Sequence, residues 1–298
     1  MPGKGAIDIV VNLKTPEIVE KYGVVTDDRF RDQIRQEGDQ RGAKTVEQYM
    51  GMMADANIDH SLLIAARYGD LRVEGSMHLP YHEVEAVCRA HPGKFSGLAG
   101  IDPTKGMEGL YELERAVKEQ GFIGAHWYPH WFGMTPDCPQ IYPYYAKCCE
   151  LGIPIMMQVG QSLIYSANRR MTSPAKPILL DQVACDFPEL KLIGIHIGTP
   201  WENEMIAMCW KHENVYMAGD AYAPKHWPKS VVRYADSYGQ SKFMFGTDWG
   251  VIDPVRAMHD VRQLDFRPKA LAKILRNTAI DVFSLPFEKM TEDEAAAA

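Results

Sequence analysis

Two short apolar runs in this sequence each lead into a residue that can move protons or bind a metal ion. The run 191–196 ends in His196, and the run 242–247 is followed directly by Asp248. Each run is too short for a helix and rich in β-forming residues, so both are predicted to be buried strands. In a barrel of parallel strands, catalytic groups stand at the carboxyl ends of the strands. His196 and Asp248 are therefore predicted to face one cavity as an acid/base pair.

The elements that must position these two residues alternate regularly along the chain. Apolar strand candidates are separated by amphipathic helical stretches, and eight such units make a closed α/β barrel. The strands are predicted at 7–12, 60–66, 95–101, 122–126, 153–158, 191–196, 214–218 and 242–247. An open doubly wound sheet is the alternative, but the first strand lacks the glycine-rich turn that usually follows it in such sheets. The predicted fold class is α/β, a TIM (β/α)8 barrel.

Length and spacing indicate a single domain. The chain has 298 residues, and α/β barrels commonly reach ~250 residues as one unit. Residues 15–44 form a long first βα loop, which is expected to be a lid or a subunit contact. Residues 286–298 are expected to form a C-terminal tail. One barrel domain is therefore predicted to span residues 1–298.

Composition and net charge indicate what kind of molecule the protein binds. The net charge is -7 and no Lys/Arg-rich block offsets it, which argues against nucleic-acid binding. No apolar stretch approaches the ~20 residues of a membrane span, and the N-terminal run is too short and polar for a signal peptide. The six cysteines show no C-x-x-C spacing, which indicates reduced thiols. We expect a cytoplasmic protein whose partner is a small-molecule substrate.

Further polar residues follow the predicted strands and extend the candidate site. Substrate-binding roles are predicted for Arg67, His126, Tyr128, Gln158, Asn12, Tyr222 and Trp249, while His130, Gln161 and Asp220 also stand at strand ends. Arg67 and the pair 169–170 could bind a carboxylate, because a buried arginine needs an anionic partner. Structural roles are the alternative: Asp248 could cap a loop, and His126 could pack within the aromatic cluster 127–131.

Several segments together resemble one enzyme family. Gly194-Ile-His-Ile-Gly followed by Pro200-Trp, and Phe245-Gly-Thr-Asp-Trp, are similar to the later strand motifs of the amidohydrolase-related family. That family is the branch of the amidohydrolase superfamily that includes aminocarboxymuconate-semialdehyde decarboxylase. Segments 121–125, 152–155 and 214–216 extend the resemblance in order along the chain. It implies a barrel enzyme and a homo-oligomer.

The resemblance also predicts where metal ligands would stand. The family usually places His-x-His at the end of strand one, His at the end of strand five and Asp at the end of strand eight. This sequence has Val10, Asn12 and Gln158 at the histidine positions, and only Asp248 remains. Amide and aliphatic side chains cannot replace imidazole ligands, so no metal cofactor, and in particular no catalytic zinc, is expected. Nothing in the spacing indicates a different metal site built from His126, His130, His196 and Asp248.

The function that this reasoning favours is acid/base catalysis without a metal. Asp248 as base and His196 as acid/base suit an activated substrate, since such a pair contributes about 10²–10⁴-fold in rate. The expected protein is a metal-independent hydrolase of a small lactone- or ester-like catabolic compound, carboxylated or aromatic in character. A decarboxylase of the same family type is one alternative. A barrel that only binds a small molecule is the other.

Overall fold

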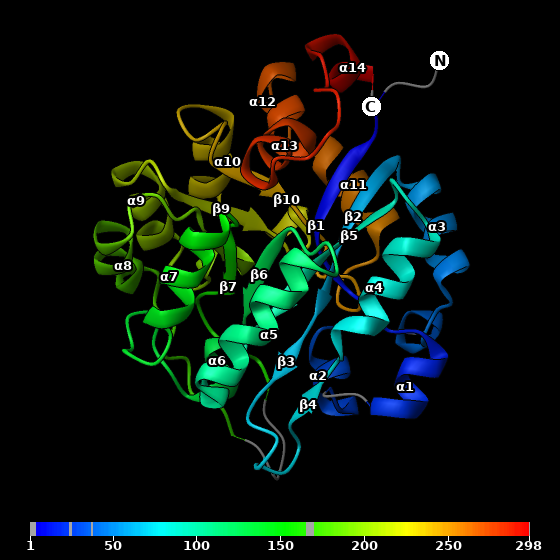
Figure 1. Ribbon diagram of the computed structural model, residues 1–298. Helices are drawn as coiled ribbons and strands as arrows, with labels where there is room; N and C mark the ends of the chain where they lie inside the picture. Colours follow the sequence, from blue (N-terminus) through cyan, green and yellow to red (C-terminus); the bar gives the residue numbers. More distant parts are fainter. Residues whose placement is uncertain (1–3, 24–25, 37, 165–169, 298) are drawn as a thin grey trace.

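The computed structural model describes residues 4–23, 26–36, 38–164 and 170–297. Parallel strands form a barrel in the order β1-β2-β5-β6-β7-β8-β9-β10 (Figure 1). They are β1 (Ala6–Asn12), β2 (Ile58–Ala65), β5 (Phe95–Gly100), β6 (Gly124–Trp127), β7 (Ile155–Gln158), β8 (Leu192–Ile195), β9 (Val215–Gly219) and β10 (Phe243–Phe245). The predicted TIM barrel is confirmed, and each observed strand overlaps a predicted run.

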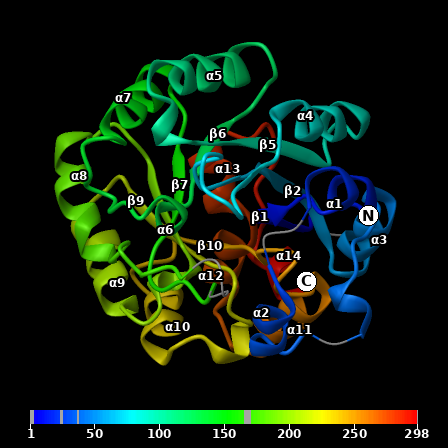
Figure 2. The same ribbon diagram turned by 90° about the horizontal axis from the view of Figure 1, so that it is seen from below.

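Helices ring this barrel, as the view from below shows (Figure 2). They include α3 (Val46–Asp55), α4 (Tyr81–Ala90), α5 (Met107–Lys118), α7 (Tyr142–Leu151), α8 (Leu180–Asp186), α9 (Glu202–Lys211), α10 (Lys229–Asp236) and α11 (Pro254–Arg262). The strands are buried on both faces: one face packs under the helices, and the other fills the barrel interior with side chains such as Met156 and Ile193. Continuous apolar runs are the sequence pattern that such strands require.

The barrel closes between its first and last strands through a side chain. The Asp8 carboxylate of β1 accepts hydrogen bonds from the Thr247 backbone nitrogen at 2.9 Å and from the Thr247 hydroxyl at 2.6 Å. A single backbone bridge joins Val11 to Trp249 just beyond. Asp8 is fully buried, which raises its pKa to about 7. The segment directly before Asp248 is therefore fastened to the first strand.

Smaller elements gather at the end of the barrel where the strands finish (Figure 1). The long first connection contains α1 (Pro16–Tyr22), α2 (Asp28–Gln33) and the 3₁₀ turn η1 (Gly38–Arg41). A hairpin of β3 (Arg67–Tyr68) and β4 (Met77–His78) follows β2, and α6 (Pro129–Phe132) follows β6. These short elements were not predicted, because two to seven residues carry no recognisable period.

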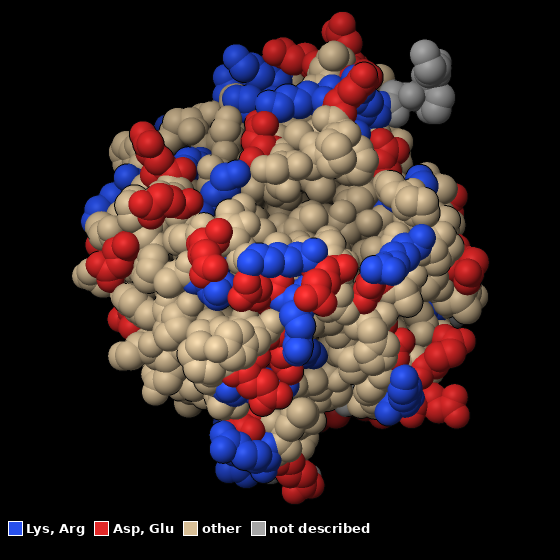
Figure 3. Space-filling view, in the orientation of Figure 1, with Lys and Arg blue, Asp and Glu red and all other residues tan. Residues whose placement is uncertain are grey.

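The C-terminal part lies at the opposite end. It consists of α12 (Pro268–Ala272), the π-turn η6 (Lys273–Asn277), α13 (Thr278–Phe283) and α14 (Glu292–Ala297). The expected tail thus includes a short helix, with Ala295 buried against the body. Within the described ranges, no helix combines the length and apolar character needed to cross a bilayer. Acidic and basic side chains are interspersed over the face drawn in Figure 3.

One buried histidine away from the strand ends makes stability depend on pH. The His60 ring lies 3.0 Å from both the Gly93 carbonyl and the Ser96 hydroxyl, and burial lowers its pKa to about 4. Between about pH 6.5 and pH 4 the unfolded chain binds a proton at His60 that the folded chain does not, so stability falls on acidification. We expect His60→Gln to remove up to about 3 kcal/mol of that loss.

Urea unfolding measured at several pH values between 4 and 7 checks this prediction. His82→Gln, which removes a histidine whose side chain is 64% exposed, is the matched control. If wild type and His60→Gln lose stability equally on acidification, His60 is not the responsible group.

Candidate active site

Three titratable side chains meet at the ends of β8, β9 and β10. Gly194 is paired with Met217 and Phe245 with Gly219, so the residues that follow these strands stand side by side. The His196 Nε2 atom lies 3.3 Å from Asp220 Oδ2 and 3.5 Å from Asp248 Oδ2. Asp220 Oδ1 accepts a hydrogen bond from the His196 backbone nitrogen at 2.8 Å. The strand ends thus build a compact group of one imidazole and two carboxylates.

The backbone is unusual at the same place. His196 and Asp248 have φ angles of 65° and 52°, and Ala221, directly after Asp220, has 60°. Left-handed backbone in non-glycine residues costs on the order of 1–2 kcal/mol and concentrates at functional sites. These turns direct the chain sharply away from each strand, which leaves the His196 and Asp248 side chains facing the barrel axis.

Asn12 at the end of β1 fixes the orientation of Asp248. Its amide nitrogen donates to Asp248 Oδ1 at 2.6 Å and to the Trp249 carbonyl at 3.3 Å. Its amide oxygen accepts hydrogen bonds from the Tyr68 and Tyr128 hydroxyls at 3.1 and 3.3 Å. The two tyrosine rings stack with centroids 5.0 Å apart. Asp248 is therefore held through a network that spans β1, β3 and β6.

The electrostatics of His196, Asp220 and Asp248 favour a positive charge beside the two carboxylates. Burial, followed by the charge of Asp248, raises the pKa of Asp220, and burial raises the pKa of Asp248 to about 7. Burial lowers the pKa of His196 to about 3, so its ring is neutral. The buried atoms His196 Nε2 and Asp220 Oδ2 have no hydrogen-bond partner among the described residues. Two adjacent buried carboxylates with unsatisfied atoms are destabilised unless a proton or a bound cation neutralises part of their charge.

The same atoms fit a divalent metal ion. Ligand atoms of His196, Asp220 and Asp248 all lie within 4.8 Å of one another. A neutral imidazole and two carboxylates are the donors that metal ions use, and two hard oxygens beside one nitrogen favour ions such as Mn²⁺ over a thiolate-preferring ion. These three residues would hold the ion, and Asn12 would orient one of its ligands.

A cavity of about 120 Å³ lies over this group. Its walls are aromatic, formed by Tyr68, Tyr128, Trp131 and Tyr222, and Phe30 of α2 reaches into the same lining. The long first connection thus contributes a cover to the cavity, as a lid would. Sites for drug-sized ligands begin at about 300 Å³, so a cavity of this smaller size suits a small ligand with one aromatic ring. Among the described residues, no lysine or arginine lines it.

Most of the predicted site residues come together here. The cavity is lined by Asp248, His196, Asn12, Tyr128, Gln158 and Tyr222. Gln158 donates to the Gln161 carbonyl at 3.4 Å, and the Gln161 amide donates to the Tyr222 hydroxyl at 3.3 Å. This polar side faces the aromatic wall and can bind oxygen substituents of a ring.

Two other predicted residues lie next to the cavity without lining it. His126 is fully buried with its ring centroid 4.2 Å from that of Tyr128, and neither ring nitrogen has a hydrogen-bond partner within the described segments. Trp249 packs its ring 4.3 Å from Tyr49 and offers only its carbonyl to Asn12. Their predicted substrate contacts stay predictions.

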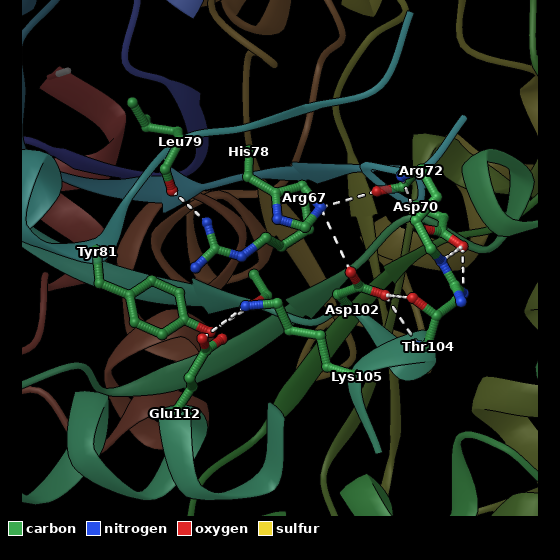
Figure 4. Close-up of polar contacts among 12 residues, drawn as sticks. Arg67, Asp70, Arg72, His78, Leu79, Tyr81, Asp102, Thr104, Lys105 and Glu112 are labelled. Atoms are coloured by element: carbon green, nitrogen blue, oxygen red, sulfur yellow. Dashed lines mark hydrogen bonds and ion pairs between the residues drawn. The ribbon is translucent and has the colours of Figure 1, made fainter. Parts of the chain in front are cut away.

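Arg67 lies outside the cavity, which corrects its expected position. It precedes Tyr68 in a strand where successive side chains alternate, so the two point to opposite faces. The Arg67 guanidinium donates to the Leu79 carbonyl and lies 4.3 Å over the Tyr81 ring (Figure 4). A carbonyl and an aromatic face satisfy this buried cation without a substrate. Arg169, also considered for carboxylate binding, lies outside the described residues.

Sequence reasoning overlooked one central residue. Asp220 was recognised at a strand end but received no role, because it does not stand at a usual ligand position of the family. The signal was present, since Asp220 follows an apolar run as His196 and Asp248 do. Tyr68 and Gln161, which the sequence also places at strand ends, likewise received no committed role.

The geometry describes a TIM barrel with a candidate metal centre at its catalytic end. A family model described as Amidohydrolase matches residues 27–285, and the chain belongs to that family. The expectation of an enzyme, a hydrolase or carboxy-lyase, is confirmed at this level. A search of curated proteins gave no match.

Solved structures share the fold. An uncharacterized TIM-barrel protein from Bordetella bronchiseptica is 21% identical, with a TM-score of 0.74 over 98% of this chain and 99% of its own. A 2,6-dihydroxybenzoate decarboxylase in complex with 2,6-dihydroxybenzoate is 15% identical, with a TM-score of 0.72 over 95% and 100%. A dihydroxybenzoic acid decarboxylase from Polaromonas sp. JS666, with bound manganese and 2-nitroresorcinol, is 16% identical, with a TM-score of 0.70 over 96% and 98%.

The expectation of a site without a metal cofactor is wrong. Similar solved decarboxylases carry manganese, and His196, Asp220 and Asp248 form a candidate ligand group. The error arose because the family's histidine positions are occupied by Val10, Asn12 and Gln158, and because the alternative site that was considered, built from His126, His130, His196 and Asp248, did not include Asp220. The ends of β8 and β9 place His196 and Asp220 where they could act as ligands beside Asp248.

Proposed function

We propose that this protein is a divalent-metal-dependent decarboxylase of a single-ring aromatic acid. The observation that carries the proposal is the aromatic cavity of about 120 Å³ placed directly on the group of His196, Asp220 and Asp248. The decarboxylase structures of the same fold support it. Hydrolysis, which the sequence favoured, has no comparable support in the shape and lining of the cavity.

Different residues of this chain have different roles in such a reaction. His196, Asp220 and Asp248 would hold a metal ion, which would supply positive charge to bind and polarise the oxygens of the acid. Tyr68 and Tyr128 stack along one side and present an aromatic wall to a flat ring. Gln158 and Gln161 offer amides to hydroxyl substituents. The mostly apolar walls limit the contact of a bound ring with water, which strengthens the polar contacts that the ring makes.

Decarboxylation also needs one proton at the carbon that loses CO₂. The C–C bond breaks, its electron pair stays on the ring carbon, and a proton takes the place of the carboxylate. Besides the tyrosines, His196 and Asp248 are the titratable residues in the described lining of the cavity. His196 Nε2 would carry no proton while it binds a metal ion, so the predicted acid/base role is kept within the proposed reaction at the Asp248 carboxyl group.

Incubation of the manganese-loaded enzyme with a panel of substrates tests the proposal. The panel contains hydroxybenzoic and dihydroxybenzoic acids together with lactones and aryl esters. We expect CO₂ release from at least one aromatic acid, and its loss in Asp248→Asn. Asp293→Asn, at an exposed carboxylate of α14, is the matched control. Hydrolysis of a lactone or ester with no CO₂ from any acid would contradict the proposal.

A further inference from the structure

A lysine close to the active site has no partner in the described structure. Lys14 lies two residues beyond the end of β1, and it is neither fully exposed nor fully buried. No hydrogen bond or ion pair of its ammonium group is present among the described residues. Burial lowers its pKa, and Arg31 of α2 lowers it further by repulsion. An unpaired, partly desolvated ammonium is unfavourable until an anion reaches it.

The cavity beside Lys14 adjoins the active-site cavity, since the two share part of their lining. Lys14 lines a space of about 90 Å³ that shares Asn12, Thr26, Tyr68 and Val251 with the aromatic cavity. The rest of its lining is almost entirely apolar, and within the described residues Lys14 is its only basic side chain. A substituent on a ring bound over Asp248 can therefore extend past Asn12 toward the ammonium group.

Charge balance indicates what that substituent is. A divalent ion would offset the charges of Asp220 and Asp248, so a first carboxylate bound to the ion would leave the metal centre with a net negative charge that disfavours a second anion there. The aromatic cavity offers no lysine or arginine in its described lining. A second carboxylate on the substrate would thus meet a countercharge at Lys14, which the nearby Arg31 cation of α2 repels.

We propose that Lys14 binds a second carboxylate of the substrate, so that the substrate class is aromatic dicarboxylic acids. This inference rests on the proposed function for the position of the first carboxylate. In this inference Lys14 determines substrate specificity. The first carboxylate lies at the metal centre, and the ring substituent that carries the second carboxylate lies in the 90 Å³ cavity. Lys14 also lines an open groove of about 510 Å³ together with Lys44, and the proposal assigns the second carboxylate to the 90 Å³ cavity rather than to this groove.

Binding of unreactive analogues to the manganese-loaded enzyme tests the inference without turnover. Benzoate and isophthalate, measured by calorimetry, differ only in the second carboxylate. We expect wild type to bind isophthalate about 10-fold or more tightly than benzoate, because a charged hydrogen bond contributes about 1.5–3 kcal/mol. Lys14→Met should abolish this preference, and Lys14→Arg should retain most of it. Lys44→Met, a loss of charge in the open groove alone, is the matched control.

The outcomes separate the two proposals. If Lys14→Met keeps the preference for isophthalate, or if wild type shows none, the role of Lys14 is refuted while decarboxylation of a monocarboxylic acid can still be observed. If the preference disappears in Lys44→Met instead, the anion binds in the open groove and the inference is wrong. If neither analogue binds and no aromatic acid releases CO₂, the proposed function fails together with it.

Discussion

Asp220→Asn is expected to lose the bound divalent ion and to lower turnover by about 100-fold or more. Residues that merely support metal ligands typically contribute about 10–100-fold to affinity or activity, and Asp220 is proposed as a ligand itself. Its Oδ2 atom is buried, unpartnered among the described residues and 3.3 Å from His196 Nε2. An amide at this position keeps the shape but replaces half of the carboxylate with an N–H group that repels a cation.

The measurement is manganese content by mass spectrometry after dialysis, together with initial rates at saturating Mn²⁺. Asp293→Asn again controls for loss of a carboxylate, and circular dichroism checks that the barrel is folded. Asp220 Oδ1 also accepts a hydrogen bond from the His196 backbone, and the asparagine side-chain oxygen can preserve it. One manganese per chain and undiminished turnover in Asp220→Asn would show that the ion is bound elsewhere.

Asp220 also shows how far the sequence could predict the site. An ionisable residue directly after an apolar run is a pattern that a single sequence displays, and it identified His196 and Asp248 as well as Asp220. Which of these residues meet is decided by the register of neighbouring strands, here Gly194 with Met217 and Phe245 with Gly219. That register is set by tertiary pairing, which a single sequence does not display. The metal prediction was therefore based on the family's ligand positions, and it was wrong.

Arg67 illustrates the opposite failure. The sequence places Arg67 at a strand end, next to Tyr68. A buried arginine at such a position is a reasonable anion-binding candidate. One residue of alternation in a strand decides which side chain enters the cavity. The hairpin that sets this alternation contains two residues per strand, which is too short for any periodicity to reveal. The eight barrel strands, in contrast, were predicted because burial on both faces forces an apolar run at each of them.

Asp8→Ala is expected to destabilise the fold by about 3 kcal/mol and to weaken manganese binding as well. The Asp8 carboxylate is the acceptor for the Thr247 backbone nitrogen and hydroxyl and for the Val10 nitrogen, all in a dry interior. Each buried donor left without an acceptor costs about 1–3 kcal/mol. Manganese binding should weaken because Thr247, which Asp8 holds in place, directly precedes the proposed metal ligand Asp248. Urea unfolding and manganese titration measure the two effects.

A destabilised barrel could lose its metal for a general reason, so the control must destabilise it elsewhere. Gly97→Ala serves, because an added Cβ would lie 2.9 Å from the Phe122 ring, in the contact between the barrel and its outer helices. At comparable loss of stability, only Asp8→Ala should reduce manganese affinity. Equal losses of affinity in the two variants would mean that Asp8 supports the fold but not the position of Asp248.

The side-chain bond across the seam can be isolated by a double-mutant cycle. Thr247→Val keeps the shape of the residue and removes the hydroxyl that donates to Asp8 at 2.6 Å. In the double variant Asp8→Ala, Thr247→Val, neither partner of this bond is left unsatisfied, so the destabilisation should be smaller than the sum of the single effects by about 1–2 kcal/mol. Additive effects would instead place the cost of Asp8→Ala in the backbone donors. Closure of the barrel would then depend on the loop geometry around Thr247 rather than on its hydroxyl.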